Sequence, residues 1–443
     1  MDFKNKATKI ELTSLRTPQM RAFHMTWFAF FLCFFGWFGI VPLMKGEHGV
    51  IASLGLTPDQ VGNTVIAGVA ATIFARLAIG PLVERWGSRI TYTLLLIIGS
   101  LPVMLIGLSQ TYEQFLLFRL AIGVIGASFV ITQYHTSVMF APNVVGTANA
   151  TTAGWGNLGG GVTQAVMPMI LAAVLIFGVP AAIGWRAAMV VPGIALFLTG
   201  FAYFKFTQDA PDGNYADLRA KGEMPSKKAN KGSFMEALKD TRVIVLFFVY
   251  AACFGIELTI NGTAALYFFD KFGLSVATAG LVASLFGLMN IFARSIGGVL
   301  SDKLNKTRGL QGRVYFLFAV LLLEGIALIF FSRLAALVIA IPALILFSLF
   351  VQMSEGATYA IVPYINKRAL GSVSGIVGAG GNFGAVTAGF LFKGAIEFSD
   401  AYLMLGIFVT IAAFLAFAVR FSEADEKAAK EEMAARLAAV SGD

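Results

Sequence analysis

The sequence predicts an all-α integral membrane protein built from two similar halves. First, 57% of its 443 residues are hydrophobic and only 13% are charged, which is far too apolar for a soluble protein of this length. Second, apolar stretches of about 20 residues recur along the chain, and these cross a bilayer as helices because lipid offers no partner for open backbone groups. Third, two motifs occur once in each half of the chain.

Twelve apolar stretches are expected to span the membrane, each near the length that a hydrocarbon core about 30 Å thick requires. In order they are 22–44, 60–83, 90–108, 115–140, 147–178, 184–206, 243–269, 276–300, 314–332, 335–363, 370–396 and 401–420. The longest polar stretch follows the sixth span and divides the chain. We therefore predict an N-terminal six-helix half at 1–204, a cytoplasmic linker at 205–242, a C-terminal six-helix half at 243–421 and a cytoplasmic tail at 422–443.

The distribution of positive charge predicts the orientation. With the N-terminus inside, most of the 33 Lys and Arg residues fall on the cytoplasmic side, so both termini are expected in the cytoplasm. This asymmetry accounts for the net charge of +8 without a nucleic-acid partner. The opposite loops hold only Lys45, Arg186, Lys271, Arg333 and Lys393.

Targeting and enzyme motifs are not expected in this chain. The first 20 residues lack the apolar core of a cleaved signal peptide, so the first span is expected to direct insertion. Cys33 and Cys253 lie within spans, and the three histidines show no metal-ligand spacing. We therefore predict no metal, no cofactor and no catalytic residues, and within the linker a short helix at "SFMEALKD", with Ser233 as its N-cap.

The two repeated motifs indicate an internal duplication. An R-x3-G-x3-[DE] pattern runs from Arg76 to Glu84 and again from Arg294 to Asp302. A glycine-flanked asparagine occurs as "GWGNLGGG" around Asn157 and, at nearly the same offset, as "AGGNFGAV" in the second half. Two repeated halves with a long middle loop are typical of secondary transporters, which bind substrate between the halves.

Arg76 and Arg294 are charged residues in the middle of predicted spans. Each precedes the acidic residue at the cytoplasmic end of its span by eight positions, which places it roughly 12 Å deep. A charge there costs about 2.5 to 3.5 kcal/mol and normally marks a substrate path. We interpret the pair as a central anion site, because guanidinium groups present paired planar donors to an oxyanion. The alternative is that each pairs with a carboxylate on another helix, such as Glu257, Glu324 or Glu355.

Glycines surround both asparagines. Without side chains, neighbouring helices can approach closely, the cavity narrows to the size of a small ion, and the two halves can rock past each other. Asn157 and Asn382 would then offer amide groups to the ion. The alternative is that these glycines serve helix packing alone. The glycines are Gly154, Gly156, Gly159, Gly160, Gly161, Gly380, Gly381 and Gly384.

Other charges near the cytoplasmic ends have separate interpretations. Glu84, Arg89 and Asp302 are expected to form a cytoplasmic gate that stabilises one conformation, with ordinary positive-inside anchoring as the alternative. Arg119 begins a span and is expected to be structural or to extend toward the membrane boundary.

Five stretches of the chain resemble a known family. The stretches "RAFHMTWFAFFLCFFGWFGIVPL", "VVGTANATTAGWGNLGGGVTQAVMP", "YAACFGIELT", "FARSIGGVLSDKL" and "YAIVPYINKRALGSVSGIVGAGGNFGAVTAGF" are similar to the nitrate/nitrite porters of the major facilitator superfamily, and more closely to the high-affinity nitrate transporter branch. The resemblance implies that Arg76 and Arg294 clamp nitrate and that Asn157 contacts it. It further implies substrate contacts from Tyr250, Phe254 and Phe129, for which core packing is the alternative.

Importing an anion against an inside-negative potential costs about 2.3 kcal/mol per charge per 100 mV, so nitrate uptake across the plasma membrane needs coupled protons or an exchanged anion. We expect proton symport by rocking alternate access, with Glu257 as the proton site; Glu324 and Glu355 are weaker candidates. The alternatives are a nitrate/nitrite antiporter and, less favoured, a membrane nitrate sensor. Nitrite as a second substrate and the need for an accessory subunit stay open.

Overall fold

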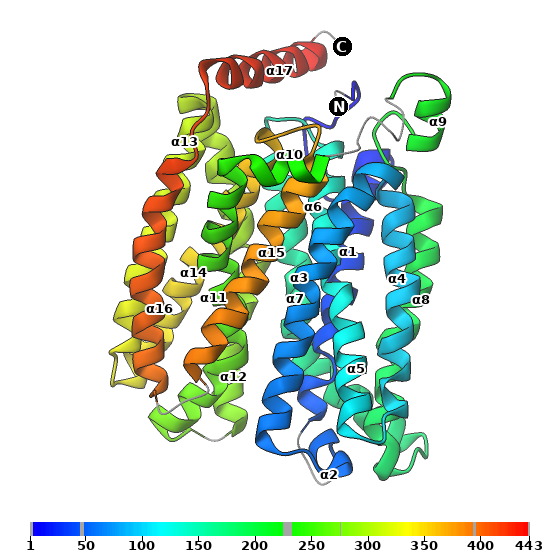
Figure 1. Cartoon of the computed structure of the whole chain (residues 1–443), viewed down its shortest axis with the longest axis vertical. Coiled ribbons are helices and arrows are strands. Elements are labelled where there is room, and N and C mark those ends of the chain that lie inside the picture. The colour runs from blue at the N-terminus through cyan, green and yellow to red at the C-terminus, as the bar shows by residue number, and fades with distance from the viewer. Residues whose placement is uncertain (1–2, 45–47, 225–232, 275, 393–395, 442–443) are drawn as a thin grey trace.

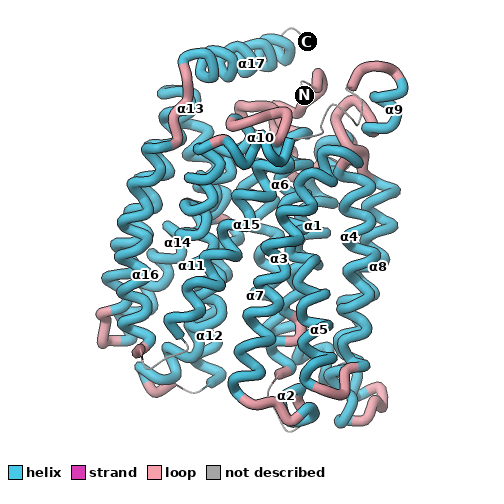
Figure 2. Tube along the Cα trace, viewed as in Figure 1, coloured by secondary structure: helices cyan, strands magenta, loops and turns pink. Residues whose placement is uncertain are grey.

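The computed structural model describes residues 3–44, 48–224, 233–274, 276–392 and 396–441. Long helices run side by side, and both termini lie at the same end of the bundle (Figure 1). Within the described residues the secondary structure is helix and loop, as Figure 2 shows, apart from two isolated β-bridges. The predicted all-α class is confirmed. Lys45 and Lys393, two of the charges expected on the far side, lie outside the described residues.

Helices of the N-terminal half coincide with the first six predicted spans. The span predicted at 115–140 consists of two α-helices joined by a 3-10 turn at Val124–Ala127. A short helix, α2 (Val50–Leu54), follows the first span. The long helices are α1 (Pro18–Phe38), α3 (Pro58–Trp86), α4 (Ser88–Leu105), α5 (Tyr112–Gly123), α6 (Ser128–Met139), α7 (Val145–Ile176) and α8 (Gly184–Phe206).

Helices of the C-terminal half also coincide with the predicted spans. The span predicted at 276–300 consists of two helices joined by a 3-10 turn at Met289–Ile291. The second of them ends at a kink at Gly309, whose φ of 69° favours glycine, and the helix after the kink contains the span predicted at 314–332. The helices are α11 (Thr241–Phe272), α12 (Val276–Leu288), α13 (Ala293–Ser332), α14 (Leu337–Ile361), α15 (Leu370–Gly389) and α16 (Phe398–Ala413).

Ten helical segments of the described chain are long and apolar enough to cross a membrane, and the bent helix α7 makes an eleventh. One of the ten, Leu281–Ser332, includes the interruption at Gly309 and covers parts of two predicted spans. The predicted count of twelve spans therefore stays a prediction.

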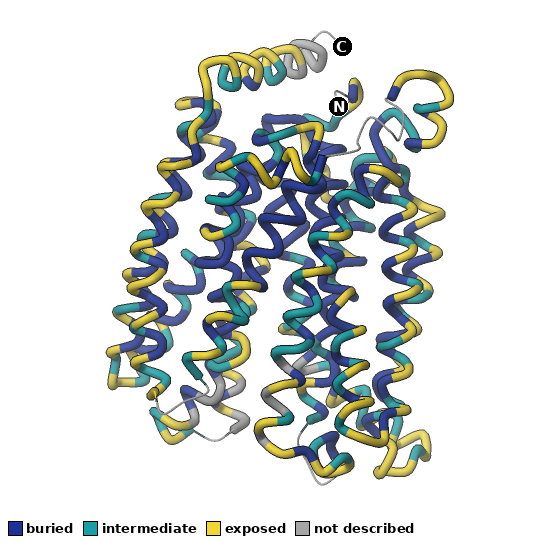
Figure 3. The backbone as a smooth tube through the Cα atoms, in the orientation of Figure 1, coloured by how far each residue is buried: buried dark blue, intermediate teal, exposed yellow. Residues whose placement is uncertain are grey.

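Exposure follows the pattern of a membrane protein. Buried residues fill the centre of the bundle, and exposed ones lie on its outside (Figure 3). Many exposed positions are large and apolar, such as Phe74 at 73%, Leu198 at 61% and Ile411 at 66% exposure. Charged side chains, including Arg76 and Arg294, are buried inside instead. This inversion suits a bundle whose outer surface faces lipid.

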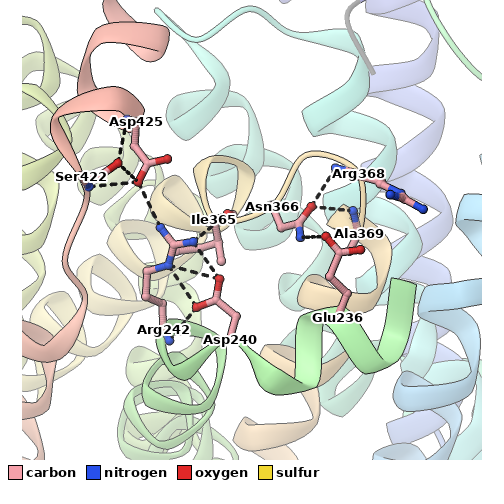
Figure 4. Close-up of polar contacts among 9 residues, drawn as sticks. All are labelled: Glu236, Asp240, Arg242, Ile365, Asn366, Arg368, Ala369, Ser422 and Asp425. Carbon is pink, nitrogen blue, oxygen red and sulfur yellow. Dashed lines mark hydrogen bonds and ion pairs between the residues drawn. The ribbon is translucent and has the colours of Figure 1, made fainter. Parts of the chain in front are cut away.

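Short helices of the linker and tail cover the end where the termini lie (Figure 1). They are α9 (Tyr215–Ala220), α10 (Ser233–Lys239) and α17 (Glu423–Ser441), and α10 begins at the predicted Ser233. Figure 4 shows Arg242 of α11 between two carboxylates, Asp240 at 2.7 Å and Asp425 at 3.4 Å. The pair with Asp425 connects the tail to the start of α11, and the pair with Asp240 is local to the junction between linker and helix.

Two carboxylates from these peripheral segments cap helices of the bundle. Asp209 accepts hydrogen bonds from the backbone N–H groups of Arg89, in the first turn of α4, and Tyr215, at the start of α9. Burial raises the pKa of the Asp209 carboxyl group. Glu426 of α17 accepts from Leu310 and Gln311, directly after the interruption of α13. Both supply partners for backbone donors that a helix start leaves open.

Candidate functional site

The two predicted arginines meet at one aromatic ring in the centre of the bundle. Arg76 of α3 and Arg294 of α13 are fully buried. Their guanidinium carbons lie 4.9 Å and 5.6 Å from the centre of the Phe129 ring on α6. The structure thus brings together one cation from each half, with Phe129 packed against both.

Among the residues that the structure describes, the hydrogen-bond partners of Arg76 are backbone oxygens. Its Nε donates to the carbonyl of Gly126 at 3.2 Å, and its Nη1 donates to the carbonyl of Gly378 in the opposite half at 2.5 Å. Within the described chain, its Nη2 has no hydrogen-bond partner, and no carboxylate forms an ion pair with it. A buried guanidinium with a free donor is suited to hold an anion.

Arg294 is different, because it pairs with a carboxylate. Its Nη1 contacts Glu355 of α14 directly and lies 3.9 Å from Glu257 of α11, while its Nη2 donates to the hydroxyl of Tyr250 at 2.8 Å. The expectation that neither arginine has an acidic partner is therefore wrong for Arg294. The reason is that α14 packs on α13 and points Glu355 inward, which the sequence of α13 does not reveal.

Asn157 and Glu257 belong to one hydrogen-bonded group. Asn157 donates to Glu257 at 3.3 Å, and Asn290, in the turn before α13, donates to the other oxygen of the same carboxylate at 2.7 Å. Asn382, the repeat partner of Asn157, is fully buried, and neither its amide nitrogen nor its oxygen has a described hydrogen-bond partner. The side chain of Asn382 is thus available to a ligand.

The predicted aromatic residues stack together beside the arginines. The Phe129 ring is nearly parallel to Tyr250 and Phe254, with ring centres 5.8 Å and 6.0 Å away. It also meets the edge of Tyr359, whose hydroxyl donates to the carbonyl of Ser374. Flat faces beside two guanidinium groups suit a flat anion.

Two residues of this site, Tyr359 and Asn290, are not identified from the sequence, which gives Glu355 only as a weaker candidate. Glu355 and Tyr359 are four positions apart on α14 and so share one face. That spacing of polar groups in an apolar helix was a usable signal. Asn290 carried none, since a single amide near a helix break has no repeat partner.

The eight glycines around Asn157 and Asn382 mainly pack helices within each half, which was the alternative interpretation. A Cβ at Gly159 would lie 2.1 Å from a backbone oxygen of α1, and one at Gly384, its repeat partner, 2.4 Å from a backbone oxygen of α11. Gly156, Gly160, Gly380 and Gly381 also pack against α1 or α11, and Gly161 has open space. Only Gly154 of the eight is close to the other half, at Asn290 and Arg294.

The halves instead approach through the glycines of the R-x3-G-x3-[DE] motif. A Cβ at Gly80 of α3 would lie 2.5 Å from the carbonyl oxygen of Gly371 on α15. A Cβ at Gly298 of α13 would lie at the same distance from the carbonyl oxygen of Gly146 on α7. Neither pair has room for a methyl group, so bare backbones meet across the boundary at two equivalent places.

Beside each glycine pair, a carboxylate crosses between the halves. Glu84 accepts from the backbone N–H of Ser372, in the first turn of α15, and Asp302 accepts from that of Thr147, in the first turn of α7, both at 2.7 Å. Glu84 also accepts from the hydroxyl of Ser233 on α10. Negative groups are favourable at helix N-termini, so both contacts join the two halves at this end of the boundary.

Arg89 does not take part in these contacts. Its Nε donates to the carbonyl of Phe204, its guanidinium lies over the Phe204 ring, and its backbone N–H donates to Asp209. Besides its contact with Thr147, Asp302 forms an ion pair with the buried side chain of Arg313 at 2.7 Å. Arg119 is buried and donates to the carbonyl of Trp37, a structural role.

Comparisons with known proteins agree on the fold and the family. Residues 26–388 match the Major Facilitator Superfamily. The chain is 39% identical to "High affinity nitrate transporter 2.5" of Arabidopsis thaliana over 89% of its length and 78% of that protein, and 31% identical to "Nitrate/nitrite transporter NrtP" of a Picosynechococcus species over 82% and 83%. The solved proton:xylose symporter XylE superposes with a TM-score of 0.68 at 14% identity, covering 91% of this chain and 96% of that one.

Proposed function

Because the chain belongs to the major facilitator superfamily and, within it, to the nitrate/nitrite porter family, we propose that it imports nitrate across the plasma membrane by proton-coupled alternate access. The relatives' names support nitrate as substrate, with nitrite as a second one. The observation that carries the proposal is Arg76, a buried cation with a free donor and no carboxylate among its described partners.

Nitrate is flat and carries one negative charge, and the site offers matching features. The guanidinium groups of Arg76 and Arg294 would donate to its oxygens from the two halves. The face of Phe129 would stack on the plane of the ion, and Asn157, Asn382 and Tyr250 would supply further donors. Phe254, parallel to Phe129 and 5.2 Å from the guanidinium carbon of Arg76, completes the aromatic wall.

The described conformation is closed at the end where the termini lie. If that end is cytoplasmic, as the charge distribution predicts, the paired contacts of Glu84 and Asp302 belong to a state that receives nitrate from outside. Loss of those contacts would accompany opening toward the cytoplasm.

Proton coupling is supported by the buried carboxyl groups beside Arg294, since exchange of one anion for another needs no titratable group. Proteoliposomes containing the purified chain test both mechanisms. Symport predicts that a pH gradient, acidic outside, drives nitrate accumulation into nitrite-free vesicles. Accumulation only when nitrite is loaded inside would show exchange instead, and no uptake of either ion under both conditions would refute transport.

A further inference from the structure

The C-terminal half buries three carboxyl groups close together: Glu257 at 2% exposure, and Glu324 and Glu355 at 0%. They belong to α11, α13 and α14 respectively. Three buried acids near one cation cannot all be ionised without a large cost. The charged and titratable groups that interact with Glu355 are Arg294 and Glu324 of α13, Glu257, Tyr250 and Cys253 of α11, and Arg76 of α3.

Glu257 and Glu355 depend on Arg294 to different degrees. Both approach the same guanidinium nitrogen, Nη1, but Glu355 contacts it directly and Glu257 lies 3.9 Å away. Glu257 also accepts hydrogen bonds from Asn157 and Asn290, one at each oxygen. Among the described residues, Glu355 is hydrogen-bonded to Arg294 through its ion pair, its Oε1 has no hydrogen-bond partner, and its carboxyl group also interacts with that of Glu257.

This difference decides which acid responds to an anion. If Arg294 turns its donors to a ligand, Glu257 keeps two amide donors and can stay ionised. Glu355 loses its counter-charge in a fully buried position, where an isolated carboxylate takes up a proton rather than stay charged. Glu324 makes no ion pair with Arg294 in the described structure, so it loses no counter-charge when a ligand takes that donor.

We infer that nitrate and the carboxylate of Glu355 compete for Arg294, and that Glu355 is the group that binds the coupled proton. Nitrate accepts the hydrogen bond of Nη1, the ion pair with Glu355 breaks, and a hydronium ion from the same side protonates an oxygen of Glu355, leaving water. One negative and one positive charge have then entered together, so the net charge of the site is unchanged. The inference rests on the proposed function, and it replaces Glu257 with Glu355 as the proton site.

Proton uptake on nitrate binding tests this directly. The purified full chain is mixed with nitrate in weak buffer containing a pH dye, with chloride as the control anion. We expect about one proton to enter per nitrate bound, and by linkage the apparent nitrate Kd should rise up to about tenfold per pH unit where free Glu355 is ionised. Glu355→Gln should bind nitrate with no proton uptake and a pH-independent Kd.

Matched variants separate Glu355 from its neighbours. Glu257→Gln should keep the proton uptake, and Glu113→Gln, at an exposed position on α5, should match the wild type in every measurement. Glu355→Asp keeps a carboxylate, should restore proton uptake, and provides a folding control for Glu355→Gln. In proteoliposomes, Glu355→Gln should retain nitrate counterflow and lose accumulation driven by a pH gradient.

Several outcomes would overturn the inference. Undiminished proton uptake by Glu355→Gln would exclude Glu355 as the proton site. Loss of proton uptake in Glu257→Gln alone would return the role of proton site to Glu257. Nitrate binding to the wild type without proton uptake at any pH would remove Glu355 and leave nitrate transport standing. Failure of the wild type to bind nitrate at all would instead refute the proposed function.

Discussion

Arg76 is the residue on which the proposed anion site depends. Among the described residues, its guanidinium donates to two carbonyl groups, of Gly126 in its own half and Gly378 in the other, and lies over the rings of Phe129 and Phe254. A planar guanidinium reaches both carbonyls and still points a third nitrogen inward, which a lysine ammonium group, as a point charge, cannot do. The planar shape of the side chain therefore matters as much as its charge.

Replacing Arg76 by Lys should weaken nitrate binding at least about tenfold, because the paired donors are lost while the charge stays. Titration of nitrate into the purified variant would measure the Kd. Arg85→Lys is the control, since Arg85 is exposed on the same helix and should bind nitrate as the wild type does. Equal affinity in both variants would contradict a direct role for Arg76.

Only part of the arrangement of these residues could be predicted from the sequence. It indicated the depth of Arg76 and Arg294, because the distance to the helix end is fixed by the rise per residue. It offered Glu355 as one of three possible partners of the arginines but could not select it, because such a contact depends on which helices pack together and how each is rotated. Intramembrane acids of equal hydropathy, such as Glu324 and Glu355, look alike until the packing is known.

At the scale of elements, glycine fixes the distance between helices. Gly159 and Gly384 occupy equivalent positions on α7 and α15, and each meets the backbone of α1 or α11 directly. The sequence predicted close packing but not its partner, and the partner lies inside the half. The predicted spans matched helices well, because bilayer thickness constrains length. The sequence predicted a break between the spans 276–300 and 314–332, but not that the two helices meet at a kink at one residue, Gly309.

Gly384→Ala should lower the thermal stability of the protein. Its Cβ would lie 2.4 Å from the backbone oxygen of Ala251, and forcing α11 and α15 apart should cost about 1 to 3 kcal/mol. The melting temperature in detergent measures this. Gly161→Ala is the matched control, because nothing lies within 4 Å of its Cβ position and alanine favours a helix. A similar loss in both variants would argue against a packing role.

At the scale of the whole molecule, two equivalent contacts join the halves at one end. In each, a carboxylate at the end of a helix in one half binds a backbone N–H in the first turn of a helix in the other. Both lie near a pair of touching glycine backbones. Because the contacts are related by the internal repeat, a rigid rocking motion must break both together.

Glu84→Ala combined with Asp302→Ala should therefore favour the conformation open at that end. Loss of a helix-capping carboxylate costs about 1 kcal/mol per contact, enough to shift the ratio of states roughly thirtyfold for two. Distances between spin labels at exposed Lys205 and Lys306, each changed to Cys, would report the opening; the native cysteines are buried. An unchanged distance distribution would show that these contacts do not hold the closed state.

The hydrogen bond from Arg76 to Gly378 crosses the boundary between the halves beside the proposed anion site. The free nitrogen of the same guanidinium is Nη2, so an anion bound there would leave the bond from Nη1 in place. One side chain of the first half would then hold the ion and, through its other nitrogen, stay attached to the second half.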